Sequence, residues 1–422
     1  MSYSEWETYK LGDLVESISV RHAFNKTKLI FLNTSDILNG KVLNKSYADI
    51  NTFPGQAKKS IKKGDILFSE IRPKNKRFAL VNFDADDYVV STKLMVLRRK
   101  SELIDNKFLY FYLTSDQTIN YLQSIAEGRS GTFPQITFNE LRDIKIKLPD
   151  INEQKAIARI LSTLDEKIET NNQINEKLEE MAQALFKHWF VDFEFPNENG
   201  EPYKSSGGEM VESELGMIPK GWEVGKLGEL VEISNKSIKP QEYPEKFFEH
   251  YSIPAFDNGK TPEFQKGKEI KSNKYVINNH VVLVSKLNPS TKRIWKPITQ
   301  TKNAICSTEF IVYMSKKGNI LSYVFEYLNN EKFQGVLTAN ATGSTGSRQR
   351  VKPKETLNYK VVLPPLKLMQ QFSRMIEPMH LEIGSNMIEN QKIKGLRDIL
   401  LPKLMSGEIR VPLDNEELVE QS

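Results

Sequence analysis

Trp6–Glu16 reads WETYKLGDLVE, and Trp222–Glu232, which begins 216 residues later, reads WEVGKLGELVE. The same offset aligns the apolar run Ile66–Ser69 with Val282–Ser285. A near-constant offset over such a distance indicates an internal duplication, and the chain is expected to hold two copies of one unit of roughly 195 residues.

Each copy begins with a segment of mixed character. Short apolar runs such as Asp65–Ile71 and Val281–Leu287, bounded by Gly, Pro and Asn, are typical of strands. Asn106–Ala126 has the apolar spacing of a helix. Strands and helices do not alternate as they do in βαβ folds, so each copy is expected to form an α+β globule.

Each copy ends in a segment whose apolar residues recur at alternating intervals of four and three, the heptad pattern of a coiled coil. The line of apolar positions along each helix, here called the seam, is interrupted by asparagine at the same two positions in both copies. These asparagines are Asn171, Asn175, Asn386 and Asn390. A buried asparagine in a seam lowers stability but fixes the register, and these polar centres match if the two helices pair antiparallel. The alternative, in which each helix packs only on its own globule, does not explain the repeated asparagines.

The sequence therefore predicts an α+β fold with a pseudo-two-fold internal repeat, in which two similar globular domains are separated by a pair of long antiparallel, coiled-coil-like helices. The expected parts, in chain order, are a first globule, a first helix, a polar linker, a second globule, a second helix and an acidic tail, over residues 1–149, 150–195, 196–220, 221–364, 365–411 and 412–422.

Composition places the chain among ordinary soluble proteins, since 39% of its residues are hydrophobic and 27% are charged. No apolar run approaches the roughly 18–20 residues that a membrane span needs, and Met1–Lys10 has no apolar signal core, so a cytoplasmic location is expected. The single cysteine, Cys306, excludes an internal disulfide and a cysteine-cluster zinc site, and the five histidines lack paired spacing. We expect no metal site.

The sequence holds only fragments of catalytic motifs. Gly259–Thr261 ends like a Walker A loop but lacks the earlier glycine. Pro364 and Pro365 lack the flanking amide or acid and the aromatic ring of an adenine-methyltransferase motif. Asp150 at the start of a helix is better interpreted as a cap than as part of a nuclease site. We expect no catalytic residues in this chain.

Positive charge gathers in loops at equivalent positions of the two copies, although the formal net charge is only +5. Loops that carry Lys and Arg for phosphates and polar groups for base edges suit duplex DNA. Residues matched between the copies are expected to contact phosphates, namely Lys76, Arg77, Lys292 and Arg293. Residues that differ between the copies are expected to read bases, namely Arg72, Lys74, Asn75, Asn288, Ser290 and Thr291. The alternative is that each charge run is a solvated face.

A second pair of loops, Glu127–Gln135 and Thr342–Arg350, is rich in glycine, which would let the backbone approach DNA closely. The alternative is an ordinary tight turn. These loops add candidate DNA contacts at Arg129, Gln135, Arg348 and Arg350. The basic stretch of the second copy that holds Lys292 and Arg293 adds Lys296.

The chain resembles the specificity subunits of type I restriction-modification systems, the HsdS family, over nearly its full length. The resemblance is carried by the Trp-Glu…Leu-Gly openings, by DILFSEIRP at Asp65–Pro73, by LPDINEQKAIARILSTLDEKI at Leu148–Ile168, by the join around His188–Val224 and by LLPKLMSGEI at Leu400–Ile409.

The resemblance implies two target-recognition domains that read a bipartite, asymmetric site on double-stranded DNA. It also implies partners: two modification (methyltransferase) subunits and restriction/translocase subunits, on which S-adenosylmethionine, ATP and Mg²⁺ are expected, with no cofactor in this chain. Two other readings remain open: a self-contained DNA methyltransferase or nuclease, and a coiled-coil scaffold that does not bind DNA.

Overall fold

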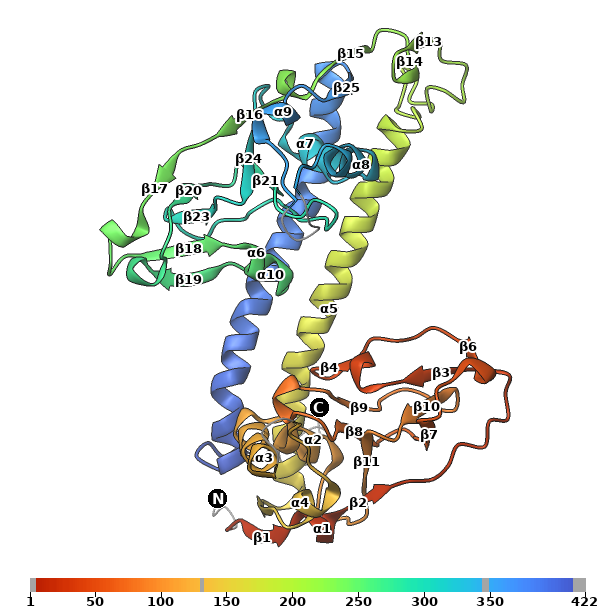
Figure 1. The fold of residues 1–422 in the computed structure, drawn as a ribbon, viewed down its shortest axis with the longest axis vertical. Helices are drawn as coiled ribbons and strands as arrows, with labels where there is room; N and C mark the ends of the chain where they lie inside the picture. Colours follow the sequence, from red (N-terminus) through yellow and green to blue (C-terminus); the bar gives the residue numbers. More distant parts are fainter. Residues whose placement is uncertain (1–4, 130–132, 344–348, 413–422) are drawn as a thin grey trace, which may run out of the picture. The chain divides into compact units, whose positions relative to one another are not determined.

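The computed structural model describes residues 5–129, 133–343 and 349–412. The chain divides into two compact units, a first unit made of Met1–Ile168 with Lys392–Ser422 and a second unit made of Glu169–Gln391. Two long helices, α5 (Ile151–Phe190) and α10 (Leu366–Ser406), contribute residues to both units (Figure 1). Within the described ranges, no helix combines the length and the apolarity that a membrane crossing requires.

The globule of the first unit holds two four-stranded sheets and a two-stranded ribbon. The strand orders are β2-β11-β8-β9 in one sheet, β6-β3-β10-β7 in the other and β1-β12 in the ribbon. The strands are β1 (Glu7–Lys10), β2 (Val15–Ile18), β3 (Lys28–Leu32), β6 (Ala48–Asp49), β7 (Ala57–Ser60), β8 (Ile66–Ser69), β9 (Phe78–Leu80), β10 (Tyr88–Ser91), β11 (Leu94–Arg99) and β12 (Lys145–Leu148). A short pair, β4 (Ile37–Leu38) and β5 (Lys41–Val42), lies apart. The helices are α1 (Leu11–Leu14), α2 (Asn106–Thr114), α3 (Asp116–Arg129) and α4 (Phe138–Arg142).

The globule of the second unit repeats this plan, with five strands instead of four in its second sheet. Its strand orders are β16-β24-β21-β22, β17-β20-β23-β18-β19 and β15-β25. The strands are β15 (Glu223–Lys226), β16 (Val231–Ser234), β17 (Ser237–Ile238), β18 (Phe247–Tyr251), β19 (Glu263–Lys266), β20 (Lys274–Val276), β21 (Val281–Ser285), β22 (Ile294–Trp295), β23 (Ala304–Ser307), β24 (Phe310–Ser315) and β25 (Lys360–Leu363). The helices are α6 (Ile253–Asp257), α7 (Leu321–Leu328), α8 (Glu331–Ala339) and α9 (Pro353–Thr356). In both globules one strand pair of the second sheet is parallel, β3 with β10 and β18 with β23. The predicted duplication and α+β character are confirmed.

The repeated opening phrase has the same structural role in both units. Leu11 and Leu227 are fully buried, and their backbone N–H groups donate to Ile144 and Tyr359 at 2.8 and 2.9 Å. The glycine that follows each leucine lies against a neighbouring segment, because an added Cβ would come within 2.8 Å of Arg142 Cβ in the first unit and 3.0 Å of Leu357 O in the second. The Leu-Gly pair thus ties the start of each globule to its end.

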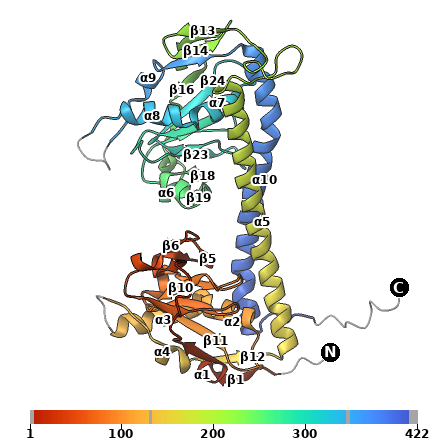
Figure 2. The same ribbon diagram turned by 90° about the vertical axis from the view of Figure 1, so that its right-hand side faces the viewer.

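The predicted antiparallel pairing of the two helices is confirmed inside each unit, where α5 and α10 run side by side (Figures 1 and 2). In the first unit the early part of α5 meets the late part of α10, and Arg397 Nη1 lies 2.8 Å from Asp165 Oδ1. In the second unit the late part of α5 meets the early part of α10, where Phe372 packs on Trp189 and Phe190 with ring centroids 5.6 and 5.0 Å apart.

The segment expected as a linker, 196–220, contains a hairpin. Strands β13 (Met210–Ser213) and β14 (Gly216–Pro219) pair antiparallel, with Val211 opposite Ile218. Gly216 has a φ of 95°, which a turn residue without a side chain adopts readily, and Ile218 is buried in the same core cluster as Trp222. The few apolar residues of this polar segment are therefore enough to fold it against the second globule. The expected acidic tail lies outside the described residues from 413 onward.

Two glycines of α10 give a matched test of how the second globule meets the helix. A Cβ on Gly384 would lie 1.7 Å from Ile298 Cδ1, whereas a Cβ on Gly395 would meet nothing within 4 Å. We expect Gly384→Ala to lower the free energy of unfolding by about 1–3 kcal/mol through overpacking. Gly395→Ala should raise it by up to about 1 kcal/mol through helix propensity. Denaturant unfolding of the two variants measures both, and equal effects would contradict this packing.

Candidate nucleic-acid interface

The two loops singled out in the first copy form one surface in the first unit. Ile71, just after β8, makes an antiparallel bridge with Gln135. The backbone N–H of Arg72 donates to Pro134 O at 3.0 Å, and Gln135 Nε2 donates to Glu70 Oε2 at 2.9 Å. Candidate residues from two parts of the sequence are thereby brought together.

The second unit joins its two loops in the same way. Leu287 bridges to Arg350, the N–H of Asn288 donates to Gln349 O at 2.9 Å, and the N–H of Val351 donates to Lys286 O at 3.0 Å. Arg348, another candidate contact, lies outside the described residues. The arrangement of the candidate loops is thus a property of the repeated fold.

Each pair of loops presents one side chain from the same unusual backbone. Arg72 and Asn288, which are 216 positions apart, have φ values of 45° and 48° in the left-handed region. Such a conformation costs about 1–3 kcal/mol in a residue other than glycine and persists only where its surroundings impose it. Ser69 and Ser285 provide that support, since their hydroxyls accept from the N–H two residues later at 3.1 and 3.2 Å. This serine-supported turn, here called the frame, therefore carries arginine in the first copy and asparagine in the second.

The remaining base-reading candidates lie around this frame at the surface. Lys74, Asn75, Ser290 and Thr291 are all exposed. The N–H of Lys74 donates to Gln123 Oε1 at 3.1 Å, while Ser290 Oγ donates to Asn288 Oδ1 at 2.9 Å. Backbone contacts hold these turns, and the side chains remain at the surface.

The two matched lysines make equivalent surface ion pairs. Lys76 Nζ lies 2.8 Å from Asp116 Oδ1, and Lys292 Nζ lies 3.3 Å from Glu331 Oε1. Sequence reasoning missed both acids, although they recur at nearly the same offset as the lysines. Exposed ion pairs contribute only about 0–1 kcal/mol, so either lysine can exchange its acid for another anion at little cost.

The two matched arginines turn toward the protein instead. Arg77 Nη1 donates to the carbonyls of Ser35 and Ile37 at 2.9 and 3.0 Å. Arg293 forms a two-point ion pair with Asp257 at 2.7 and 2.9 Å, and this hydrogen bonding lowers the pKa of the Asp257 carboxyl. These arginines hold neighbouring segments in place, which sequence alone did not anticipate.

Lys296 requires a correction, because its side chain is only 9% exposed. Its ammonium donates to Ser322 Oγ at 2.9 Å and to Glu377 Oε2 at 3.0 Å, and burial lowers its pKa. Lys296 therefore belongs to the interior of the second unit and not to a DNA-facing surface. Lys59 of β7 is likewise turned inward, donating to Thr92 O and Leu94 O at 3.1 and 2.8 Å.

The other glycine-loop candidates are exposed but engaged with acids. Arg129 pairs with Glu140, and Arg350 Nε lies 3.2 Å from Glu309 Oε2. These ion pairs are at the surface, so they contribute little to the free energy of unfolding.

The four seam asparagines meet across the helix pair in the second unit. Asn171 Nδ2 donates to Asn390 Oδ1 at 3.0 Å and to Glu389 Oε2 at 2.7 Å. Asn386 Nδ2 donates to Asn175 Oδ1 at 2.9 Å. A further bond runs from Asn390 Nδ2 to Asn172 Oδ1 at 3.0 Å, and neither Asn172 nor Glu389 was anticipated, since both lie beside the heptad positions.

Asn171→Ala tests this polar centre. The change removes a donor from Asn390, which is only 5% exposed, and should lower the free energy of unfolding by about 1–3 kcal/mol. The exposed neighbour Gln173→Ala serves as the control and should change it by no more than about 0.5 kcal/mol. Replacing both Asn171 and Asn390 with leucine should recover the loss. Equal stabilities of the two alanine variants would refute a buried hydrogen-bonded centre.

Comparison with known proteins finds the same family in both copies of the repeat. Residues 3–180 and 219–394 both match the family described as the type I restriction modification DNA specificity domain. The type I restriction enzyme HindI specificity subunit of Haemophilus influenzae is 33% identical over 475 residues, which cover 96% of this chain and 100% of that protein. The MjaIX specificity subunit of Methanocaldococcus jannaschii is 29% identical, with 72% of this chain and 69% of that protein covered. The solved S subunit of a type I restriction-modification system from M. genitalium shares the fold, with a TM-score of 0.56, 14% identity and 96% of each chain covered.

Proposed function

This chain belongs to the type I restriction modification DNA specificity family, and we propose that it is the subunit that sets the DNA sequence recognised by such a complex. Each globule acts as a target-recognition domain for one half of a bipartite site on double-stranded DNA. Because the two globules share a fold but differ in their loop side chains, the two half-sites differ in sequence.

The observation that carries this proposal is the repeated turn at Arg72 and Asn288. The same left-handed backbone displays a different side chain in each copy. Arginine pairs well with the O6 and N7 atoms of guanine, whereas asparagine pairs well with N6 and N7 of adenine. Two copies of one frame with different side chains are what an asymmetric recognition site requires.

The surrounding residues divide into two groups. Lys76 and Lys292 occupy matched positions and make exchangeable surface ion pairs, which suits contacts with phosphates. Lys74, Asn75, Ser290 and Thr291 differ between the copies and lie at the surface, which suits reading of base edges. Gln135 of the first unit and Arg350 of the second each bridge to the residue just before the turn of its own unit, and Arg129 is exposed at the end of α3.

We assign no catalytic step to this chain. Methyl transfer from S-adenosylmethionine and any ATP- and Mg²⁺-dependent translocation and cleavage would belong to the modification and restriction subunits. The specificity subunit would dock them through surfaces that the helix pair leaves uncovered. Among these, Ile174 and Met181 of α5 are apolar and about half exposed.

The salt dependence of DNA binding tests the proposed sorting of residues. In the assembled methyltransferase complex, Lys76→Ala and Lys292→Ala should each reduce the slope of log K against log salt by about 0.9. Both changes should weaken cognate and random duplexes alike. Arg72→Ala should instead cost about 1–3 kcal/mol on the cognate duplex only. Fluorescence anisotropy over a range of salt concentrations measures these effects.

Lys220→Ala is the matched control, because Lys220 makes a 2.8 Å surface ion pair with Glu209 outside the candidate loops. Its slope should equal that of the wild type. An unchanged slope for both Lys76→Ala and Lys292→Ala would remove these residues from the interface. A wild-type complex that binds cognate and random duplexes equally would contradict the proposed function itself.

A further inference from the structure

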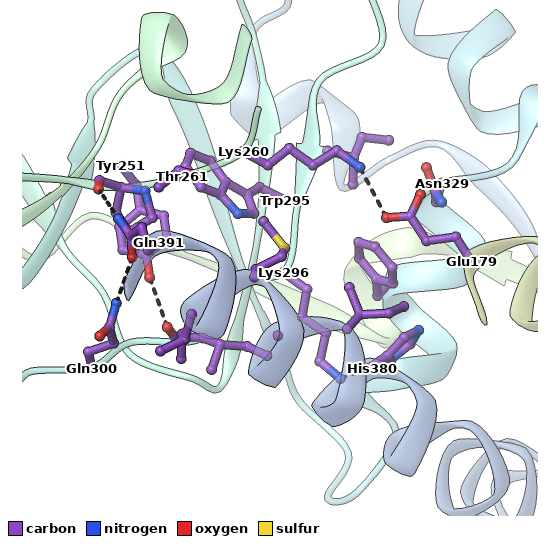
Figure 3. Close-up of a pocket in the computed structure, with 18 of the residues that line it drawn as sticks. Glu179, Tyr251, Lys260, Thr261, Trp295, Lys296, Gln300, Asn329, His380 and Gln391 are labelled. Carbon is purple, nitrogen blue, oxygen red and sulfur yellow. Dashed lines mark hydrogen bonds and ion pairs between the residues drawn. The ribbon is translucent and has the colours of Figure 1, made fainter. Parts of the chain in front are cut away.

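A cavity opens in the second unit where its globule meets α10 and α5 (Figure 3). Its walls come from the segment after β18, from β22 and the residues that follow it, from α7 and from the two long helices. The space between atoms amounts to about 810 Å³ when counted out to the open mouth. Part of this space is open solvent, so the enclosed part is smaller and has room only for a small molecule.

The middle of the cavity is apolar and aromatic. Trp295, Phe325, Ile383 and Met387 line it. Trp295 is held by Tyr251, whose ring centroid lies 4.6 Å from its own. Such a wall accepts a hydrocarbon or aromatic body, and an aromatic face also attracts a cation.

Polar contacts join the walls of the cavity at its edges. Lys260 Nζ lies 3.2 Å from Glu179 Oε1 of α5. Gln391 of α10 donates to Pro262 O and accepts from Gln300 Nε2, both at 3.2 Å. Figure 3 shows these pairs bordering the space around Trp295. The globule and the helices therefore form one site within this unit.

One end of the cavity is a buried polar cluster. Lys296 Nζ lies 3.1 Å from His380 Nδ1, and His380 Nε2 lies 2.8 Å from Glu326 Oε1. An ammonium only donates, so His380 Nδ1 accepts and Nε2 carries the proton that it donates to Glu326. His380 is thus a neutral link, and the charge of Lys296 is met by Glu377 at 3.0 Å.

Glu326 is left incompletely satisfied by this arrangement. Its side chain is 3% exposed, and its second oxygen, Oε2, is buried with no hydrogen-bond partner within the described part of the chain. An ionised Glu326 lacks a donor at Oε2, and a protonated one would have an O–H without an acceptor. A buried carboxyl in either state is costly, so a donor from a ligand would stabilise it.

The cluster is not part of the duplicated recognition apparatus. At the offsets that relate the two copies, the first unit has Leu80 in place of Lys296, Phe111 in place of Glu326 and Asp165 in place of His380. The proposed reading of DNA by the repeated loops makes no use of this cluster.

We propose that this cavity binds a small organic cation, namely a protonated amine carried on a compact aromatic or aliphatic body. Glu326 lines the cavity, and rotation of its buried carboxyl group would bring Oε2 to the ammonium as its acceptor. The body would lie between Trp295 and the α10 residues Ile383 and Met387. Because the ligand would touch the globule and both helices, binding stabilises the attachment of the globule to the helix pair. This inference does not rest on the proposed function.

The test uses the full chain, in complex with its modification subunits where solubility requires them, and 2-phenylethylamine as the probe. The neutral 2-phenylethanol has the same body and serves as the control ligand. Saturation-transfer NMR and thermal shift should detect the amine at millimolar concentration and the alcohol at least tenfold more weakly. Glu326→Gln should abolish amine binding, and Glu166→Gln, an exposed residue of α5, should leave it unchanged.

Met387→Trp is a second variant, which fills the apolar middle and leaves the polar cluster in place. It should also abolish amine binding, so the proposal stays testable if Glu326→Gln fails to fold. Absence of amine binding to the wild type would overturn the proposal. So would equal binding of the amine and the alcohol, or undiminished amine binding by both variants.

Discussion

The polar-centred seam between α5 and α10 is the constraint on which the rest of the molecule depends. Both compact units are built on these helices, and the bonds from Asn171 Nδ2 to Asn390 and from Asn386 Nδ2 to Asn175 pair the amides in one register. A shift along the seam would place these amides against apolar side chains and leave them without partners, at a cost of about 1–3 kcal/mol each. The register in turn determines which faces of the helices each globule covers.

Duplication then gives two globules of the same fold that recognise different DNA half-sites. The buried Leu-Gly pair closes each globule, and the serine-supported turns at Arg72 and Asn288 hold the same backbone in both. Selection can alter the side chain shown by each frame without disturbing its support, because the support comes from Ser69, Ser285 and backbone bonds. Non-identical half-sites follow from this separation of frame and side chain.

Much of this architecture could be predicted from the sequence, because duplication, heptads and apolar runs are local patterns. Strands such as Ile66–Ser69 and the antiparallel seam follow from them. The direction in which a charged side chain points could not be predicted, because it depends on distant partners. Lys296 meets Glu377, 81 residues away, and Arg293 meets Asp257, 36 residues away. A run of charges alone does not distinguish these inward-turned cations from the surface lysines Lys76 and Lys292.

The central claim is that each globule reads one half of an asymmetric site. The most direct test replaces residues 221–364 with a second copy of residues 1–149 and maps methylated sites by methylome sequencing in cells that carry the modification subunits. The account predicts a symmetric site, in which the half-site read by the first globule appears twice as an inverted repeat. Continued methylation of the original asymmetric site would contradict it.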